Sequence, residues 1–180
     1  RGPYGNGTPV LCAEPVIEDE PFAVLWGDEF IYADPPRLKQ MMQVHQELGG
    51  IVISGVRIER PEDLRRYGIA DMTHVRDNVY RINAIVEKPD PDMAPSNLAT
   101  HGAYILPPEV FGVLRSLGPG QGGEVWLVDA INILHEHGVP LYAVEVEGGK
   151  YYDTGNKLEY MKTVVELALE HPEIGADFRA

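Results

Sequence analysis

The chain has 180 residues, of which 44% are hydrophobic, 8% aromatic and 24% charged, a composition typical of a folded domain rather than a disordered chain. Its formal net charge is −13 and its basic residues form no cluster, which disfavours nucleic acid and anionic lipid as partners. The single cysteine, Cys12, excludes an intrachain disulfide, and no apolar run is long enough to span a membrane. We expect a cytoplasmic protein. Because residue 1 is arginine, we also expect the sequence to be the larger C-terminal part of a longer molecule.

The first third of the sequence predicts a glycine-rich loop followed by a strand, a helix and a strand. Glycines at positions 2, 5 and 7 precede a short apolar segment, and residues 22–26 form an apolar run typical of a buried strand. Apolar residues at helical spacing follow two prolines over residues 38–48, and residues 51–58 are rich in β-branched side chains. This order is typical of a crossover unit, in which the two strands run parallel.

The remaining two thirds continue the alternation of strands and helices. A turn and strand are predicted over 64–72, a strand over 79–86 and a proline-rich loop over 89–97. Further elements are expected in chain order: a strand at 103–106, helices at 110–117 and 125–137, strands at 141–146 and 150–153, and a helix at 158–169. The sequence therefore predicts one α/β domain over residues 1–180, with a mixed, mainly parallel sheet flanked by helices.

Two aspartates occupy positions where a metal site is expected. Asp28 follows the first predicted strand, and ligands of open parallel sheets gather beyond the carboxyl ends of the strands. Its carboxylate could bind Mg²⁺, which prefers oxygen ligands, or could simply be solvated at the strand end. Asp153 lies between the last predicted strand and the last helix, where it could instead cap the helix. A metal site requires the two carboxylates to meet.

A second candidate site is the sequence Glu87-Lys88-Pro89 at the end of a predicted strand. Glu87 could accept hydrogen bonds from sugar hydroxyls, and Lys88 could place its charge on a phosphate. The alternative is an ordinary charged pair on the surface. Because adjacent strand residues face opposite sides, both can serve one ligand only where the backbone is already leaving the strand.

The sequence disfavours nucleophilic catalysis. The serines lack the surroundings of a nucleophile elbow, the six histidines have no spacing typical of metal ligands, and Cys12 is expected in the core. The glycine-rich start matches neither the dinucleotide fingerprint nor the phosphate loop of nucleotide triphosphatases. Its backbone amides could meet a base or a phosphate, although a plain turn is the simpler interpretation.

Taken together, the motifs resemble those of one enzyme family along essentially the whole chain. They are, in order, Gly5-Asn-Gly-Thr-Pro-Val-Leu-Cys-Ala13, Phe22-Ala-Val-Leu-Trp-Gly-Asp28, Tyr67-Gly68-Ile69, Val86-Glu-Lys-Pro89, Ser96-Asn-Leu-Ala99, Gly122-Gly-Glu124, Asp129-Ala-Ile131 and Tyr152-Asp-Thr-Gly155-Asn-Lys-Leu158. The sequence closely resembles the bacterial UTP–glucose-1-phosphate uridylyltransferases, also called UDP-glucose pyrophosphorylases.

The resemblance implies a Rossmann-like nucleotidyltransferase fold and an enzyme that makes UDP-glucose and pyrophosphate from UTP and glucose 1-phosphate. By this resemblance Asp28 and Asp153 hold the catalytic Mg²⁺, Lys88 grips the sugar phosphate, and Gly5 lies against uracil. Glucose 1-phosphate is already an anion, so its attack needs no general base; the reaction needs alignment of two polyanions and neutralisation of the pyrophosphate.

The resemblance also assigns the sugar contacts and the assembly. Glu29 and Glu87 are expected to bind glucose hydroxyls, and the backbone of Gly68 to contact the sugar. Related enzymes assemble partly through the C-terminal end, so we expect a symmetric homodimer, or a homotetramer, involving the last helix.

The sequence leaves two alternatives open. Residues 6, 8 and 9 differ from the usual family pattern, Glu29 stands where aspartate is commoner and Trp126 replaces a usually polar residue, so dTTP or another hexose phosphate could be the substrate. The glycine-rich, basic signature with which the family usually begins is not in these 180 residues. A non-catalytic module that binds sugar nucleotides is therefore the second alternative.

Overall fold

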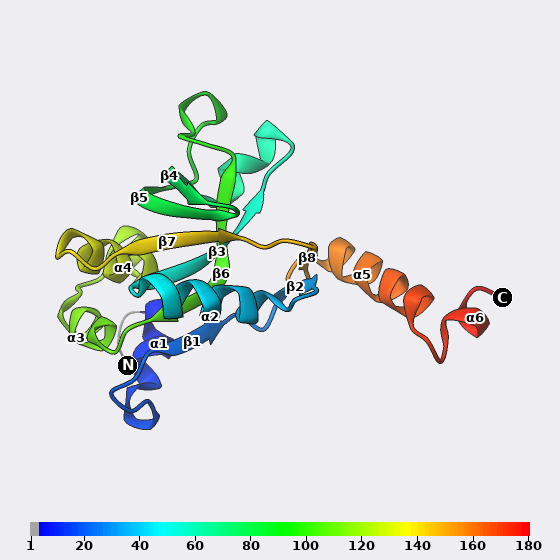
Figure 1. Cartoon of the computed structure of the whole chain (residues 1–180), viewed down its shortest axis with the longest axis horizontal. Coiled ribbons are helices and arrows are strands. Elements are labelled where there is room, and N and C mark those ends of the chain that lie inside the picture. Colours follow the sequence, from blue (N-terminus) through cyan, green and yellow to red (C-terminus); the bar gives the residue numbers. More distant parts are fainter. Residues whose placement is uncertain (1–3) are drawn as a thin grey trace.

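The computed structural model describes residues 4–180, so Arg1, Gly2 and Pro3, the start of the glycine-rich segment, lie outside the described residues. Figure 1 shows three parts: a central sheet with helices on both faces, a small two-stranded ribbon at one end of it, and a helical arm that projects beyond the ribbon. Within residues 4–180, no helix combines the length and apolar character needed to cross a bilayer.

The central sheet has six strands in the order β1-β6-β3-β7-β5-β4. The strands are β1 (Phe22–Leu25), β3 (Ile51–Arg57), β4 (Gly68–Arg76), β5 (Val79–Glu87), β6 (Leu98–Leu106) and β7 (Leu141–Glu145). The α/β class is confirmed, but the prediction of a mainly parallel sheet was wrong. Among residues 4–180, β3 and β7 are the one parallel pair of the sheet, and its other strand pairs are antiparallel.

The sheet is mostly antiparallel because β6 inserts between the two strands of the expected crossover unit. It pairs antiparallel with both β1 and β3, so those two strands run in the same direction, as predicted, without being hydrogen-bonded neighbours. β6 is also longer than the segment expected at 103–106 and reaches β4 with its first half. The antiparallel hairpin β4–β5 completes the sheet.

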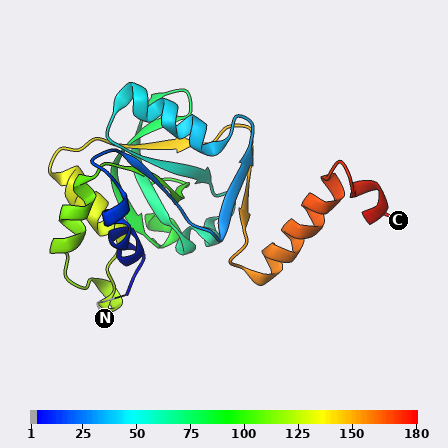
Figure 2. The ribbon, with the colours of Figure 1, turned by 90° about the horizontal axis from the view of Figure 1, so that it is seen from below.

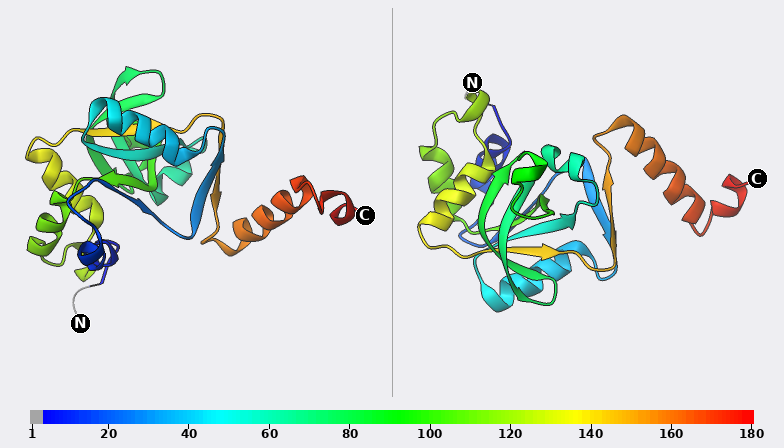
Figure 3. Two further views of the ribbon diagram at one scale, coloured as in Figure 1. Left: turned by 60° about the horizontal axis from the view of Figure 1, so that its bottom comes forward. Right: turned by 90° about the horizontal axis from the view of Figure 1, so that it is seen from above.

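Helices cover both faces of the sheet, as Figures 2 and 3 show. Those on one face are α1 (Gly7–Cys12), α3 (Glu109–Ser116) and α4 (Leu127–Glu136), which share a core cluster with strand residues such as Ile53 and Leu141. On the other face, α2 (Arg37–Leu48) packs Met41 and Val44 against Val52. Cys12, expected in the core, is exposed instead, because it lies at the last, outward-facing position of the short helix α1.

Short helical turns connect the main elements: η1 (Glu14–Val16), η2 (Pro61–Arg66), η3 (Pro91–Met93) and η4 (Gln121–Gly123). The predicted loop over 89–97 is confirmed, with η3 inside it.

The ribbon consists of β2 (Glu29–Ala33) and β8 (Gly149–Asp153), paired antiparallel so that Glu29 lies opposite Asp153. Strand β2 was not predicted. The sequence showed only that the polar residue Asp28 follows the strand predicted over 22–26. The chain turns a corner there and enters a second sheet after only three residues. On one face of the ribbon, the rings of Phe30 and Tyr152 stack with centroids 5.0 Å apart.

The helical arm consists of α5 (Lys157–Glu170) and α6 (Gly175–Phe178). Asn156 caps α5, because its side chain accepts hydrogen bonds from the backbone N–H groups of Leu158 and Glu159. The arm leaves exposed a series of large apolar side chains: Leu158, Tyr160, Met161, Val164, Val165, Ile174 and Phe178. In Figures 1 and 2 the arm points away from the sheet, so these side chains lack the cover of a core.

Candidate active site

Asp28 and Asp153, far apart in the sequence, meet around Gly155. Asp28 lies in the corner between β1 and β2, and Asp153 is the last residue of β8. The backbone N–H groups of Thr154 and Gly155 donate to the carbonyl oxygen of Asp28 at 2.9 and 3.0 Å. A Cβ atom built on Gly155 would lie 3.2 Å from Oδ2 of Asp28 and 3.4 Å from Oδ1 of Asp153. The ribbon therefore places both carboxylates at one point.

Asp153 is held by its own turn and does not cap helix α5. Its Oδ1 accepts hydrogen bonds from the backbone N–H groups of Gly155 and Asn156, both at 3.1 Å. Its Oδ2 lies 3.6 Å from a guanidinium nitrogen of Arg66 on η2. Asn156 occupies the capping position instead, and the contacts of Asp153 with its own turn and with Arg66 orient its carboxylate beside Asp28.

The donor set of this acidic pair suits a hard divalent cation. Asp28 and Asp153 offer oxygen atoms alone, and Mg²⁺ binds through one or two carboxylates while keeping several waters or taking phosphate oxygens. Among residues 4–180, no group of three or more histidine, cysteine, aspartate or glutamate side chains is arranged to hold a metal. The acidic pair thus fits an ion that shares its shell with a substrate rather than an all-protein metal cage.

Glu29, the residue after Asp28, forms a buried ion pair. Nη1 of Arg37, at the start of α2, donates to both carboxylate oxygens of Glu29 at 2.9 and 3.0 Å. The two side chains are only 6% and 8% exposed. Burial raises the pKa of Glu29 above its ordinary value, and Arg37 opposes this rise. The carboxylate expected to bind sugar hydroxyls is therefore already engaged by an arginine.

Gly68, Glu87 and Lys88 lie together at one end of the β4–β5 hairpin. Gly68 and Glu87 are opposite each other in the strand register, and a Cβ atom on Gly68 would lie 3.2 Å from Oε2 of Glu87. Strand β5 ends at Glu87, and Lys88 adopts a left-handed conformation with φ of 47°. Its ammonium group lies 3.7 Å from Oε1 of Glu87. The backbone thus leaves the strand directly after Glu87, which allows Glu87 and Lys88 to face the same ligand.

Three aromatic rings in mutually tilted contact join the end of the β4–β5 hairpin to the ribbon. The ring of His101 lies between those of Tyr67 and Tyr151, with centroids 4.6 and 4.3 Å away. Nε2 of His101 is buried and has no hydrogen-bond partner among the described residues. Burial lowers the pKa of His101 to about 4, so the imidazole is neutral at physiological pH.

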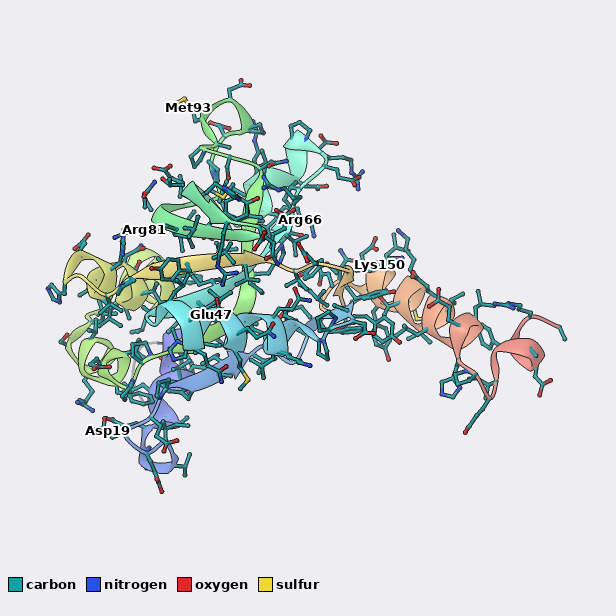
Figure 4. The ribbon with its side chains drawn as sticks, in the orientation of Figure 1. Asp19, Glu47, Arg66, Arg81, Met93 and Lys150 are labelled. Carbon is teal, nitrogen blue, oxygen red and sulfur yellow. The ribbon has the colours of Figure 1, made fainter. Side chains whose placement is uncertain are left out.

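Arg66 also connects the end of the β4–β5 hairpin to the ribbon. Its guanidinium lies over the ring of Tyr67, 5.5 Å from the centroid, and pairs with Asp153. Figure 4 shows Arg66 on the side of η2 that faces the ribbon and Lys150. A pocket of about 370 Å³ opens beside β8 and is lined by four cationic side chains, Arg60, Arg66, Lys150 and Lys162, and by three acidic ones, Asp153, Glu159 and Glu166. Lys150 pairs with Glu166 and Lys162 with Glu159, so the charges of this pocket nearly balance, in contrast to the acidic chain as a whole.

Gly5 lies apart from these residues. It has φ of 141°, and a side chain there would collide with the backbone of Val125. The backbone N–H of Gly7 donates to the carbonyl oxygen of Val125 at 2.9 Å, which holds the start of α1 against the segment before α4. Figure 2 shows α1 at the end of the sheet remote from the ribbon. The structure does not bring Gly5 into contact with the acidic pair.

Several residues of the site carried no signal in the sequence. Arg37 lies just before the helix predicted over 38–48 and received no role, and its partner precedes it by eight residues, in a strand that was not predicted. His101 and Tyr151 come from strands of different sheets. Their proximity is a property of the tertiary structure, and no spacing in the sequence could have indicated it.

Comparisons with known proteins point to one family. The model of the nucleotidyl transferase family matches residues 2–169. The chain is 41% identical over 180 residues to the UTP–glucose-1-phosphate uridylyltransferase YngB of Bacillus subtilis, and 42% identical over 171 residues to a UTP–glucose-1-phosphate uridylyltransferase of Staphylococcus haemolyticus. These matches cover 100% and 94% of this chain, but only 60% and 58% of the relatives.

The same likeness extends to solved structures. A UDP-glucose pyrophosphorylase in complex with UDP-glucose superposes with a TM-score of 0.86 and 30% identity, over 95% of this chain and 64% of that one. The UDP-glucose pyrophosphorylase of Acinetobacter baumannii superposes with a TM-score of 0.84 and 30% identity, over 96% of this chain and 59% of that one. The chain thus spans about three fifths of the length of the proteins that it matches.

Proposed function

Because this chain belongs to the nucleotidyl transferase family, we propose that the protein transfers a uridylyl group from UTP to glucose 1-phosphate, giving UDP-glucose and pyrophosphate. The observation that carries this proposal is the meeting of Asp28 and Asp153 around Gly155. Supporting it are relatives at 41–42% identity that bear the name of this activity. We assign residues 1–180 to one nucleotidyltransferase domain.

In this proposal Asp28 and Asp153 hold Mg²⁺. The bound cation would neutralise charge on the phosphoryl groups and orient them, which typically contributes several kcal/mol to transition-state stabilisation. Arg66 keeps the carboxylate of Asp153 in place by pairing with its outer oxygen. Because the attacking phosphate oxygen is already anionic, the chain needs no general base.

The end of the β4–β5 hairpin supplies the sugar phosphate site. Lys88 would place its ammonium group on the phosphate, with Glu87 beside it accepting from sugar hydroxyls. Gly68 lets the sugar approach the backbone, since a side chain there would occupy the space next to Glu87. We keep Gly5 as the contact to uracil and Glu29 as a candidate ligand of the sugar hydroxyls.

The test is release of pyrophosphate by the protein, purified as its gene encodes it, from UTP and glucose 1-phosphate with and without Mg²⁺. We expect turnover that requires the metal and that is several-fold slower when dTTP replaces UTP. Equal or faster turnover with dTTP, or with another hexose 1-phosphate, would reassign the substrate within the family. Binding of UDP-glucose with no turnover of any pair would instead support a non-catalytic module.

The helical arm is the proposed contact between subunits of a homodimer or homotetramer. Its exposed apolar side chains, such as Leu158, Met161 and Val165, form a surface that a second copy of the arm could cover. Light scattering at micromolar concentration should give at least twice the monomer mass. Met161→Glu together with Val165→Glu should reduce that mass, and a monomer in the unsubstituted protein would contradict the proposal.

A further inference from the structure

The first turns of helix α2 hold the ribbon through two buried polar side chains. Arg37 and Gln40 are three residues apart, so they lie on the same face of the helix, and they are only 5% and 7% exposed. Buried polar groups of this kind are costly unless they are fully paired. Arg37 bonds to the first residue of β2, and Gln40 bonds to the chain just after β2 and just before β8.

Gln40 fastens the chain just before β8. Its side-chain nitrogen donates to the carbonyl oxygens of Pro35 at 2.6 Å and Glu147 at 3.0 Å. Its side-chain oxygen accepts from the backbone N–H of Glu147 at 3.0 Å. Because Glu147 immediately precedes the turn into β8, Gln40 fixes where the strand that carries Asp153 begins.

Arg37 fastens the beginning of β2. Its Nη1 donates to both carboxylate oxygens of Glu29, and Glu29 follows Asp28 directly and lies opposite Asp153 in the ribbon. A shift of Glu29 would therefore move one aspartate through the chain and the other through the strand pairing.

We propose that Arg37 is a positioning residue for the acidic pair, acting through its buried ion pair with Glu29. The proposal rests on the proposed function, since it takes Asp28 and Asp153 as the metal ligands. It gives Glu29 a different role from the hydroxyl ligand that the family resemblance implies, because both oxygens of its carboxylate already accept hydrogen bonds from Arg37. Residues that orient metal ligands from outside typically contribute 10- to 100-fold to metal affinity.

The first test measures binding of Mn²⁺, as the probe cation, to the purified protein by electron paramagnetic resonance. Arg37→Met and Glu29→Gln should each weaken binding about tenfold. The double variant should be no weaker than Arg37→Met alone, because the two residues act as one unit. Arg37→Lys retains the charge and should recover part of the loss, and it also serves if Arg37→Met folds poorly.

The matched control is the ion pair between Arg57 and Glu145 on the large sheet. Nε of Arg57 donates to both oxygens of Glu145 at 3.0 Å, so the pair has similar chemistry but joins β3 to β7. Arg57→Met should leave Mn²⁺ affinity unchanged. Equal weakening by Arg57→Met and Arg37→Met would show a general loss of stability and would overturn the positioning role.

The second test does not depend on the metal. The backbone N–H groups of Thr154 and Gly155 donate to Asp28, so their hydrogen exchange reports whether the acidic corner is closed. Exchange at these two amides should be faster in Arg37→Met than in the unsubstituted protein and in Arg57→Met. Unchanged exchange in Arg37→Met would overturn the proposal, whatever the metal measurements give.

The outcomes separate this inference from the proposed function. If Asp28→Asn and Asp153→Asn leave Mn²⁺ binding unchanged, the acidic pair is not the metal site and the proposed function loses its main support, while the exchange test still decides on Arg37. If Glu29→Gln raises KM for glucose 1-phosphate at unchanged Mn²⁺ affinity, Glu29 is a hydroxyl ligand and the positioning role is wrong.

Discussion

The large sheet and the β2–β8 ribbon are attached to their surroundings by different kinds of contact. The large sheet buries apolar side chains on both faces, and Ile51, Val52 and Ile53 of its central strand are fully inaccessible to solvent. The ribbon also buries Ile31 and Tyr152, but polar and aromatic contacts fix its orientation: Glu29 with Arg37, the adjoining Glu147 with Gln40, and Tyr151 with His101. Apolar burial is non-directional, whereas each hydrogen bond fixes an orientation. Substitutions in the sheet should therefore change stability, and those in the ribbon should change function.

The largest expected effect is on the stability of the large sheet. Ile53→Ala removes a fully buried side chain from the core cluster, and such truncations typically lower the free energy of unfolding by about 2–5 kcal/mol. Chemical denaturation followed by circular dichroism measures this change. The folded protein should retain its affinity for Mn²⁺, and a large loss of that affinity at low denaturant would break the separation between sheet and ribbon.

For the acidic pair, Asp28 and Asp153, we expect a large loss of turnover and little change in stability. Asp28→Asn and Asp153→Asn remove a ligand charge from the ribbon, so Mg²⁺-dependent turnover should fall by a factor of about 10²–10³, corresponding to roughly 3–4 kcal/mol of transition-state stabilisation. Their midpoints of denaturation should stay close to that of the unsubstituted protein, since neither side chain lies in the core clusters. Turnover that survived both substitutions would contradict the proposed role of the pair.

His101, at the junction between sheet and ribbon, predicts a pH dependence of stability. Its pKa in the folded protein is lowered to about 4, whereas an unfolded histidine titrates near 6.5. The unfolded state therefore binds more protons between these values, so this contribution is complete above about pH 6.5 and is lost as pH falls towards 4. Denaturation midpoints measured from pH 7.5 to 4.5 should decrease less in His101→Phe than in the unsubstituted protein, and equal slopes would contradict the assignment.

The smallest expected effect concerns Gly155, which separates the two carboxylates. A methyl group in Gly155→Ala would lie 3.2 Å from Asp28 and 3.4 Å from Asp153, so the pair must shift by a few tenths of an ångström. We expect turnover to fall by a factor of about 2 to 10, with little change in stability, since Gly155 is exposed. Gly27→Ala is the matched control, because nothing lies within 4 Å of the added atom. Equal effects of both substitutions would mean that crowding of the pair is not the cause.

Much of the secondary structure could be predicted, because each element is encoded locally. Apolar runs and helical spacings placed β1, β3, β7 and the helices α2, α4 and α5 within a few residues of their observed bounds. The sequence also indicated Asp28 and Asp153 as candidates, because each stands at the end of a predicted strand. Strand β2 was not predicted, because its five residues, between a polar corner and two prolines, are too few to show a clear hydrophobic periodicity.

What the sequence determined by itself is therefore most of the helices and strands, though not β2, together with the family resemblance and the candidate residues Asp28, Asp153, Glu87 and Lys88. The tertiary structure alone decided that β6 lies between β1 and β3, that the last helices form a projecting arm, and that Arg37 occupies the carboxylate of Glu29. The physical reason is range: periodicity reports which face of a segment is buried, while strand neighbours and ion-pair partners depend on surfaces that meet only after folding.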